Sequence, residues 1–68
     1  MLRLENLILK HNDGTEELYE HVIIGNKHLY AQKIILPNKT ELFDVITELD
    51  FNNNILSALD NQEVLVVV

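Results

Sequence analysis

The chain has 68 residues, of which 47% are hydrophobic, and eleven acidic against five basic side chains give it a net charge of −6. This length leaves room for one domain, residues 1–68, and the absence of cysteine excludes disulfides as a source of stability. The excess of carboxylates disfavours direct binding of nucleic acid, because affinity for a polyanion depends on Lys and Arg neutralising phosphates.

The first half of the chain has the composition of β-strands separated by tight turns. Residues 4–10 form an apolar first run, and Asp13-Gly14 follows as a hairpin turn signal. Residues 17–24 alternate with a period of two, and we expect Asn26-Lys27 to form the next two-residue loop. Residues 28–36 are rich in β-branched and aromatic side chains. These runs predict a three-stranded antiparallel meander.

After Pro37 the apolar period changes to that of a helix. The residues that define its apolar stripe are Leu42, Phe43, Ile46 and Leu49. Asn38 or Thr40 would cap the start of this long helix. Residues 50–54 interrupt the pattern, and a second, short helix is expected around Ile55, Leu56 and Leu59.

The chain closes with residues 63–68, a continuous apolar run typical of a strand that is covered on both faces. A helical crossover before it predicts that this strand lies parallel to a neighbour in the sheet. The predicted fold class is therefore α+β, in the order β-β-β-α-α-β, with both helices on one sheet face.

Pairing the predicted strands separates two sheet faces, both of them apolar. The helices are expected to cover the first face, which carries Leu7, Leu9, Leu18, Val22, Ile24, Leu29, Ala31 and Ile35. A three-residue turn in place of Asp13-Gly14 would shift the first strand by one residue and reverse its faces. The candidate interface lies on the second face and comprises Tyr19, His21, Ile23, Tyr30, Gln32 and Ile34. Aromatic, His and Gln side chains among aliphatic ones are typical of protein interfaces, here most simply a homodimer, although scattered apolar residues also occur on ordinary solvent faces.

Acidic side chains are predicted to form a ridge along the exposed side of the helical region. The ridge comprises Glu41, Asp44, Glu48 and Asp50. Such a ridge could imitate DNA phosphates, and the alternative is a plain solvated helix face.

The sequence contains no pattern that predicts catalysis, a metal or a cofactor. Asp50, Asn52 and Asn54 have the spacing of a calcium loop, but Ile55 stands where the turn glycine belongs and Asn61 where the bidentate Glu belongs. We therefore expect a loop in which these side chains bond the local backbone.

These observations predict a non-enzymatic protein–protein interaction module, such as an accessory or inhibitor protein of a phage, mobile element or low-GC bacterium. The partner is another protein or a second copy of the chain, and neither a membrane nor nucleic acid is expected to bind. Alternatives are a structural subunit of a homo-oligomeric assembly, an acidic DNA mimic, and an enzyme whose site is shared between subunits around His21, His28 and Tyr30. No apolar run reaches the length of a membrane span, and charges interrupt the N-terminal apolar residues, so a cytoplasmic location is expected.

Overall fold

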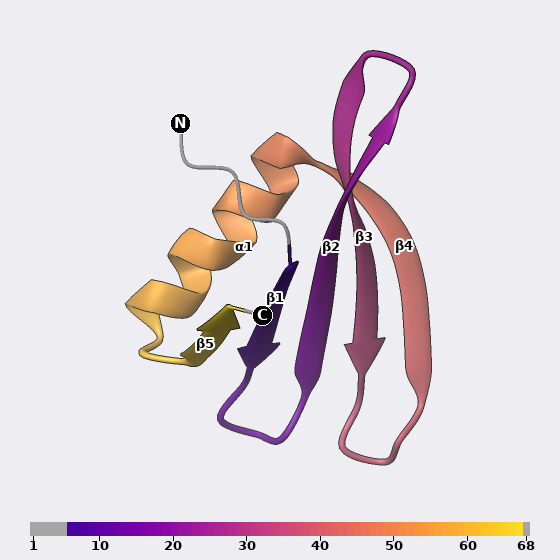
Figure 1. Ribbon diagram of the computed structural model, residues 1–68. Helices are drawn as coiled ribbons and strands as arrows, with labels where there is room; N and C mark the ends of the chain where they lie inside the picture. The colour runs from indigo at the N-terminus through magenta and orange to yellow at the C-terminus, as the bar shows by residue number, and fades with distance from the viewer. Residues whose placement is uncertain (1–5, 68) are drawn as a thin grey trace.

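A computed structural model of the chain describes residues 6–67 and confirms the α+β class. The strands and the helix of these residues are β1 (Asn6–Lys10), β2 (Glu16–Ile24), β3 (Lys27–Ile35), β4 (Glu41–Thr47), α1 (Glu48–Asp60) and β5 (Val64–Val67). The strands form a single sheet in the order β4-β3-β2-β1-β5, in which every neighbouring pair is antiparallel (Figure 1).

The two predicted hairpins are present, and both differ from the predicted register. In the β1–β2 hairpin Leu7 pairs with Tyr19, which is one residue away from the pairing that a two-residue Asp13-Gly14 loop would give. In the β2–β3 hairpin the loop is Gly25-Asn26, so Ile24 pairs with Lys27. Gly25 has φ 62°, as the first loop residue of a type II′ turn requires, and only glycine adopts this φ at little cost.

The long helix predicted after Pro37 is wrong, because residues 41–47 form strand β4. This strand extends the meander: Ile46 pairs with Tyr30, and Phe43 with Lys33. The sequence of β4 also contains Phe, Val, Ile and Thr, which favour strands. An available edge on β3 therefore outweighs the helical spacing of the apolar residues.

Helix α1 occupies the segment that was expected to be a loop followed by a short helix. Thr47 is its N-cap, and the Thr47 hydroxyl accepts a hydrogen bond of 3.2 Å from the backbone N–H of Asp50. Glu48 and Asp50 lie in the first turn, where negative charge interacts favourably with the helix dipole. The Asn-rich residues 52–54 therefore form part of the helix, and the predicted second helix is its C-terminal half.

Strand β5 lies at the edge of the sheet beside β1, to which it is antiparallel, and the predicted parallel pairing is wrong. The reason is topological: α1 carries the chain from the β4 edge to the opposite edge, so β5 runs in the direction of β4. Val64, Val66 and Val67 are exposed, and Leu65 packs against the core. The prediction of a strand covered on both faces is therefore wrong too.

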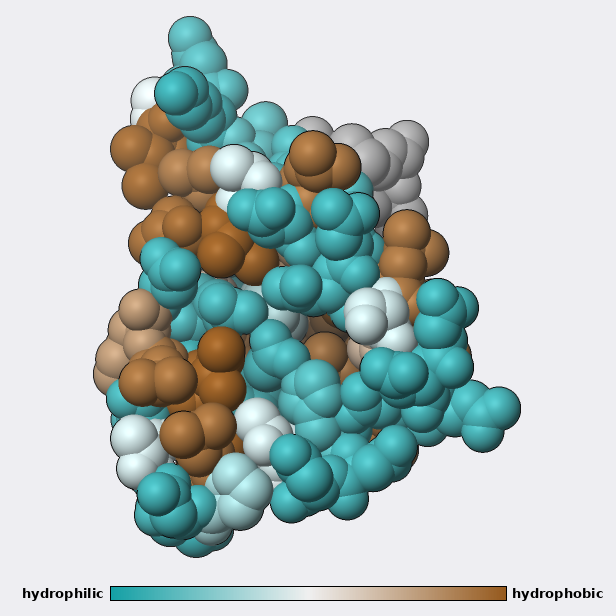
Figure 2. Space-filling model, turned by 180° about the vertical axis from the view of Figure 1, so that it is seen from behind, coloured by the Kyte–Doolittle hydropathy of each residue, from teal (hydrophilic) through white to brown (hydrophobic). Residues whose placement is uncertain are grey.

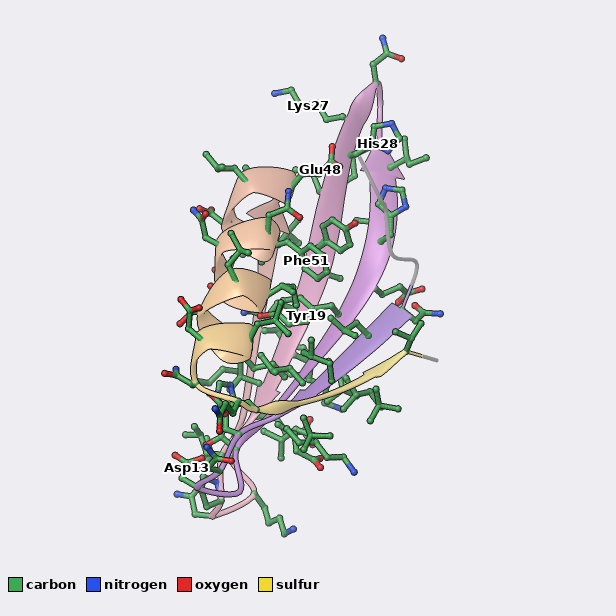
Figure 3. The ribbon with its side chains drawn as sticks, turned by 90° about the vertical axis from the view of Figure 1, so that its left-hand side faces the viewer. Asp13, Tyr19, Lys27, His28, Glu48 and Phe51 are labelled. Carbon is green, nitrogen blue, oxygen red and sulfur yellow. The ribbon has the colours of Figure 1, made fainter. Side chains whose placement is uncertain are left out.

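The helix covers one face of the sheet only, as the view along the layers shows (Figure 3). The buried core between the layers consists of Leu7, Leu9, Tyr19, Tyr30, Phe51 and Ala58. On β2 and β3 this is the face predicted to be the second, uncovered one, so the predicted choice of face is wrong. Leu7 and Leu9 of β1, predicted on the first face, join it because the first hairpin is shifted by one residue. No helix in residues 6–67 has the length and apolar character needed to cross a membrane.

Candidate binding surface

The aromatic residues of the predicted interface lie in the core. Tyr19 is 3% exposed and Tyr30 is 2% exposed, and both contact Phe51 of α1. The Tyr30 and Phe51 rings stack with their centroids 3.8 Å apart. The Tyr19 ring meets Phe51 edge-on, with the centroids 5.0 Å apart. Figure 3 shows Tyr19 and Phe51 between the sheet and the helix. Aromatic pairs gain about 0.5–1.5 kcal/mol beyond the area that they bury. Helix α1 therefore covers the sheet face whose tyrosine rings pack against Phe51.

A hydrogen-bonded network satisfies the polar atoms that the helix covers. The Tyr19 hydroxyl donates to Glu17 Oε1 at 2.5 Å and accepts from Gln32 Nε2 at 2.8 Å. Asn54 of α1 also donates to the Tyr19 hydroxyl, at 3.1 Å. Burial and the hydrogen bond to Glu17 raise the pKa of Tyr19 above its ordinary value, so Tyr19 stays neutral. Gln32, a predicted interface residue, therefore hydrogen-bonds within the protein.

His11 joins the first turn to two carboxylates from different parts of the chain. Its Nε2 contacts Glu17 Oε2 on β2, and its Nδ1 lies 2.6 Å from Glu63 Oε2, just before β5. Partial burial lowers the pKa of His11, but the hydrogen bond to Glu17 and the charges of Glu17, Glu63 and Asp13 outweigh it and raise the pKa above 6.5. Protonated His11 therefore ties together β2, the first turn and the entry to β5.

The remaining predicted interface residues share the helix-covered face but lie toward its margins. His21 Nε2 is 2.9 Å from His28 Nδ1, and the two rings stack on the β2–β3 hairpin. Ile23 is exposed near the tip of this hairpin, whereas Ile34 is partly buried. The six residues thus do not form a continuous exposed surface.

The predicted acidic ridge is dispersed over two elements. Glu41 and Asp44 lie on β4, where the strand alternation points their side chains to opposite faces. Glu48 and Asp50 lie in the first turn of α1. Glu41 pairs with Lys33 at 3.3 Å, so it does not join the others in a single acidic surface.

The opposite face of the sheet is left uncovered by the helix and is largely apolar. A hollow of about 850 Å³ lies on it, and its apolar lining on this face consists of Ile8, Leu18, Ala31, Phe43 and Val45. Asn6, Glu20 and Lys33 also line it. Phe43 is 72% exposed, which is the largest value among the large hydrophobic side chains that are exposed. We call this surface, formed by the outward side chains of the five strands, the open face.

Charge is unequally divided between the two sides of the molecule. The strand alternation places two lysines and three glutamates on the open face: Lys10, Lys33, Glu16, Glu20 and Glu41. Lys27, at the tip of the β2–β3 hairpin, points toward the helix side (Figure 3). The other described residues carry seven carboxylates against two lysines, Lys27 and Lys39. The open face therefore has a net charge of −1, and most of the net negative charge of residues 6–67 lies elsewhere.

The helix side looks different in the space-filling view. Hydrophilic residues prevail over α1, and hydrophobic ones gather at the left margin, over β4 and the β2–β3 hairpin (Figure 2). Leu49, Leu56 and Leu59 are exposed on α1 but alternate with polar and acidic residues such as Asn53 and Asp60. The apolar hollow lined by Ala31 and Phe43 lies on the side away from the helix.

The structure does not group ligands for a metal ion within residues 6–67. Asp50, Asn52 and Asn54, which share the spacing of a calcium loop, lie on helix α1. Asn52 lies about half a helical turn from both Asp50 and Asn54, so its side chain points away from theirs and the three do not share a centre.

Comparison with known proteins adds no relative from which a function could be transferred. The chain has no significant match among protein-family models, curated proteins or solved structures.

Proposed function

We propose that the protein is a protein–protein interaction module and that the open face is its binding surface. The observation that carries this proposal is the apolar hollow around Ala31, with the exposed ring of Phe43 beside it. Exposed apolar area is unfavourable in water, so soluble proteins rarely expose a large contiguous apolar patch. A patch of this kind therefore marks an interaction site.

The layout of the open face supports a protein partner. Its centre is apolar, and Glu20 and Lys33 provide polar groups beside the hollow. Protein interfaces have this arrangement, in which an apolar centre supplies most of the binding energy and polar groups at the rim exclude water and fix orientation. The nearly equal numbers of positive and negative charges on the open face disfavour a highly charged partner such as DNA.

The corrected face changes which residues are expected to bind. Tyr19, Tyr30 and Gln32 are used by the core and its hydrogen-bonded network. Phe43 and Val45 on β4 take their place, because the helix leaves their side of the sheet open.

Site-specific photo-crosslinking tests this proposal. A benzophenone side chain replaces Val45 on the open face in one variant and Asn53 on the outer side of α1 in the other, and both positions are exposed. After irradiation in cells that naturally express the chain, we expect a discrete protein adduct from position 45 and none of the same mass from position 53. If position 45 yields no discrete adduct, or both positions yield the same ones, the open face is not a specific binding surface.

A further inference from the structure

The open face has the shape of a self-complementary surface. The hollow on this face is lined both by the small side chain of Ala31 and, at its margin, by Phe43, a large ring that is mostly exposed to solvent. Ala31 pairs with Val45 across β3 and β4, and Phe43 is two residues before Val45 on the same side of β4. A projecting ring and a recess therefore stand side by side, which is what a two-fold symmetric contact requires.

The open face is large enough for a stable dimer. The five strands lie about 4.8 Å apart and average about seven residues, so they present a face of roughly 24 by 23 Å, or about 550 Å² in projection. Side-chain relief raises the accessible area above the projected area, toward the roughly 800 Å² per partner that specific interfaces bury. A chain of 68 residues also gains more from such burial than a larger protein does, because its own core is small.

The charges favour a second copy over a charged partner. The open face has a net charge of only −1, and its Lys33 is already paired with Glu41, so two copies can approach through it with little net repulsion. The acidic residues of the helix side, such as Asp50 and Asp60, would then lie on the two outer surfaces, far from each other. A partner with a strong charge of either sign finds no complementary potential on this face.

We propose that the occupant of the open face is a second copy of the chain, packed sheet against sheet about a two-fold axis. The ring of Phe43 from each copy enters the hollow around Ala31 of the other. The sheets lie about 10 Å apart, as in other face-to-face sheet pairs, with the helices outermost. This inference rests on the proposed function, since it names the partner of the same surface.

Sedimentation equilibrium on the purified chain tests the inference. The wild type should show twice the chain mass and dissociate only on dilution. Phe43→Asp places a charge in the hollow of the partner and should raise the dimer Kd at least about 100-fold. Ala31→Leu fills the hollow and should weaken the dimer as well. The matched control is Leu56→Asp, on the exposed side of α1, which should leave the Kd unchanged.

Circular dichroism of each variant checks that the monomer is folded, which we expect because Phe43 is exposed. A wild type that remains a monomer at about 1 mM overturns the inference, as does a dimer that is insensitive to Phe43→Asp or to Ala31→Leu. If the chain is a monomer but position 45 still gives a discrete adduct with another protein, the inference that the partner is a second copy is wrong. The proposed function, binding of a protein through the open face, would then still hold. A monomer without such an adduct would overturn both.

Discussion

Replacing Phe51 by Ala is the sharpest test of how the helix packs on the sheet. Phe51 is buried, its ring stacks on Tyr30 at 3.8 Å, and it meets the edge of Tyr19 at 5.0 Å. Truncation of a buried Phe to Ala costs about 3–5 kcal/mol, from lost transfer free energy and from the cavity that remains. A chain of 68 residues has a free energy of unfolding of roughly 3–10 kcal/mol, so this variant would lose much or all of its stability.

Phe51→Leu keeps most of the apolar volume and should cost about 1–1.5 kcal/mol, which keeps the variant folded and its stability measurable. The assay is urea unfolding followed by circular dichroism, at one fixed protein concentration because self-association would add stability. Leu56→Ala is the matched control on the exposed side of the same helix, with an expected change within about 0.5 kcal/mol. If Phe51→Ala destabilises the protein no more than Leu56→Ala, the helix does not bury Phe51 against the two tyrosines.

Three further predictions concern the polar contacts that hold the fold together. Because the pKa of His11 is raised in the folded state, its contribution is fully present below pH 6.5 and is lost as the pH rises through the folded pKa. The urea midpoint of the wild type should therefore fall, relative to that of His11→Gln, as the pH rises above 6.5, and parallel curves would contradict this. Thr47→Ala should cost about 1 kcal/mol by removing the N-cap, whereas Thr40→Ala, at the start predicted from sequence, should cost clearly less in the same unfolding assay. Asn54→Ala should cost about 1 kcal/mol by removing a donor to Tyr19, and an equal loss in the exposed Asn53→Ala would show that the hydrogen bond contributes nothing.

The strands of the first half could be predicted because their signals are local. The turn residues at positions 13–14 and 25–27 and the alternation of β2 depend only on neighbours in the sequence. The exact registers could not be predicted, since a shift of one residue in a turn changes every pairing after it. That single shift moved Leu7 and Leu9 to the face of Tyr19, which became the core.

The second half was harder to predict because tertiary contacts decide it. Residues 41–47 satisfy both a helical and a strand pattern, and the free edge of β3 selects the strand. The Asn-rich residues 52–54 have weak helix propensity, but the Thr47 cap and the burial of Phe51 stabilise a helix through them.

For a related reason, the sequence could not predict which face of the sheet α1 covers. Both faces are apolar, so composition alone could not show which one α1 covers. The signal that could have shown it is the ring of Phe51, which matches Tyr19 and Tyr30 and has no aromatic counterpart on β1–β3 of the open face.

The central claim is that α1 covers the face of Tyr19 and Tyr30 and leaves the face of Ala31 open. Nuclear Overhauser effects from the ring protons of Phe51 measure this directly. The structure predicts strong cross-peaks to the rings of Tyr30 and Tyr19, whose centroids lie 3.8 and 5.0 Å from that of Phe51. Cross-peaks from Phe51 to the methyl groups of Ala31 or Leu18 in place of these would put the helix on the opposite face and contradict the claim.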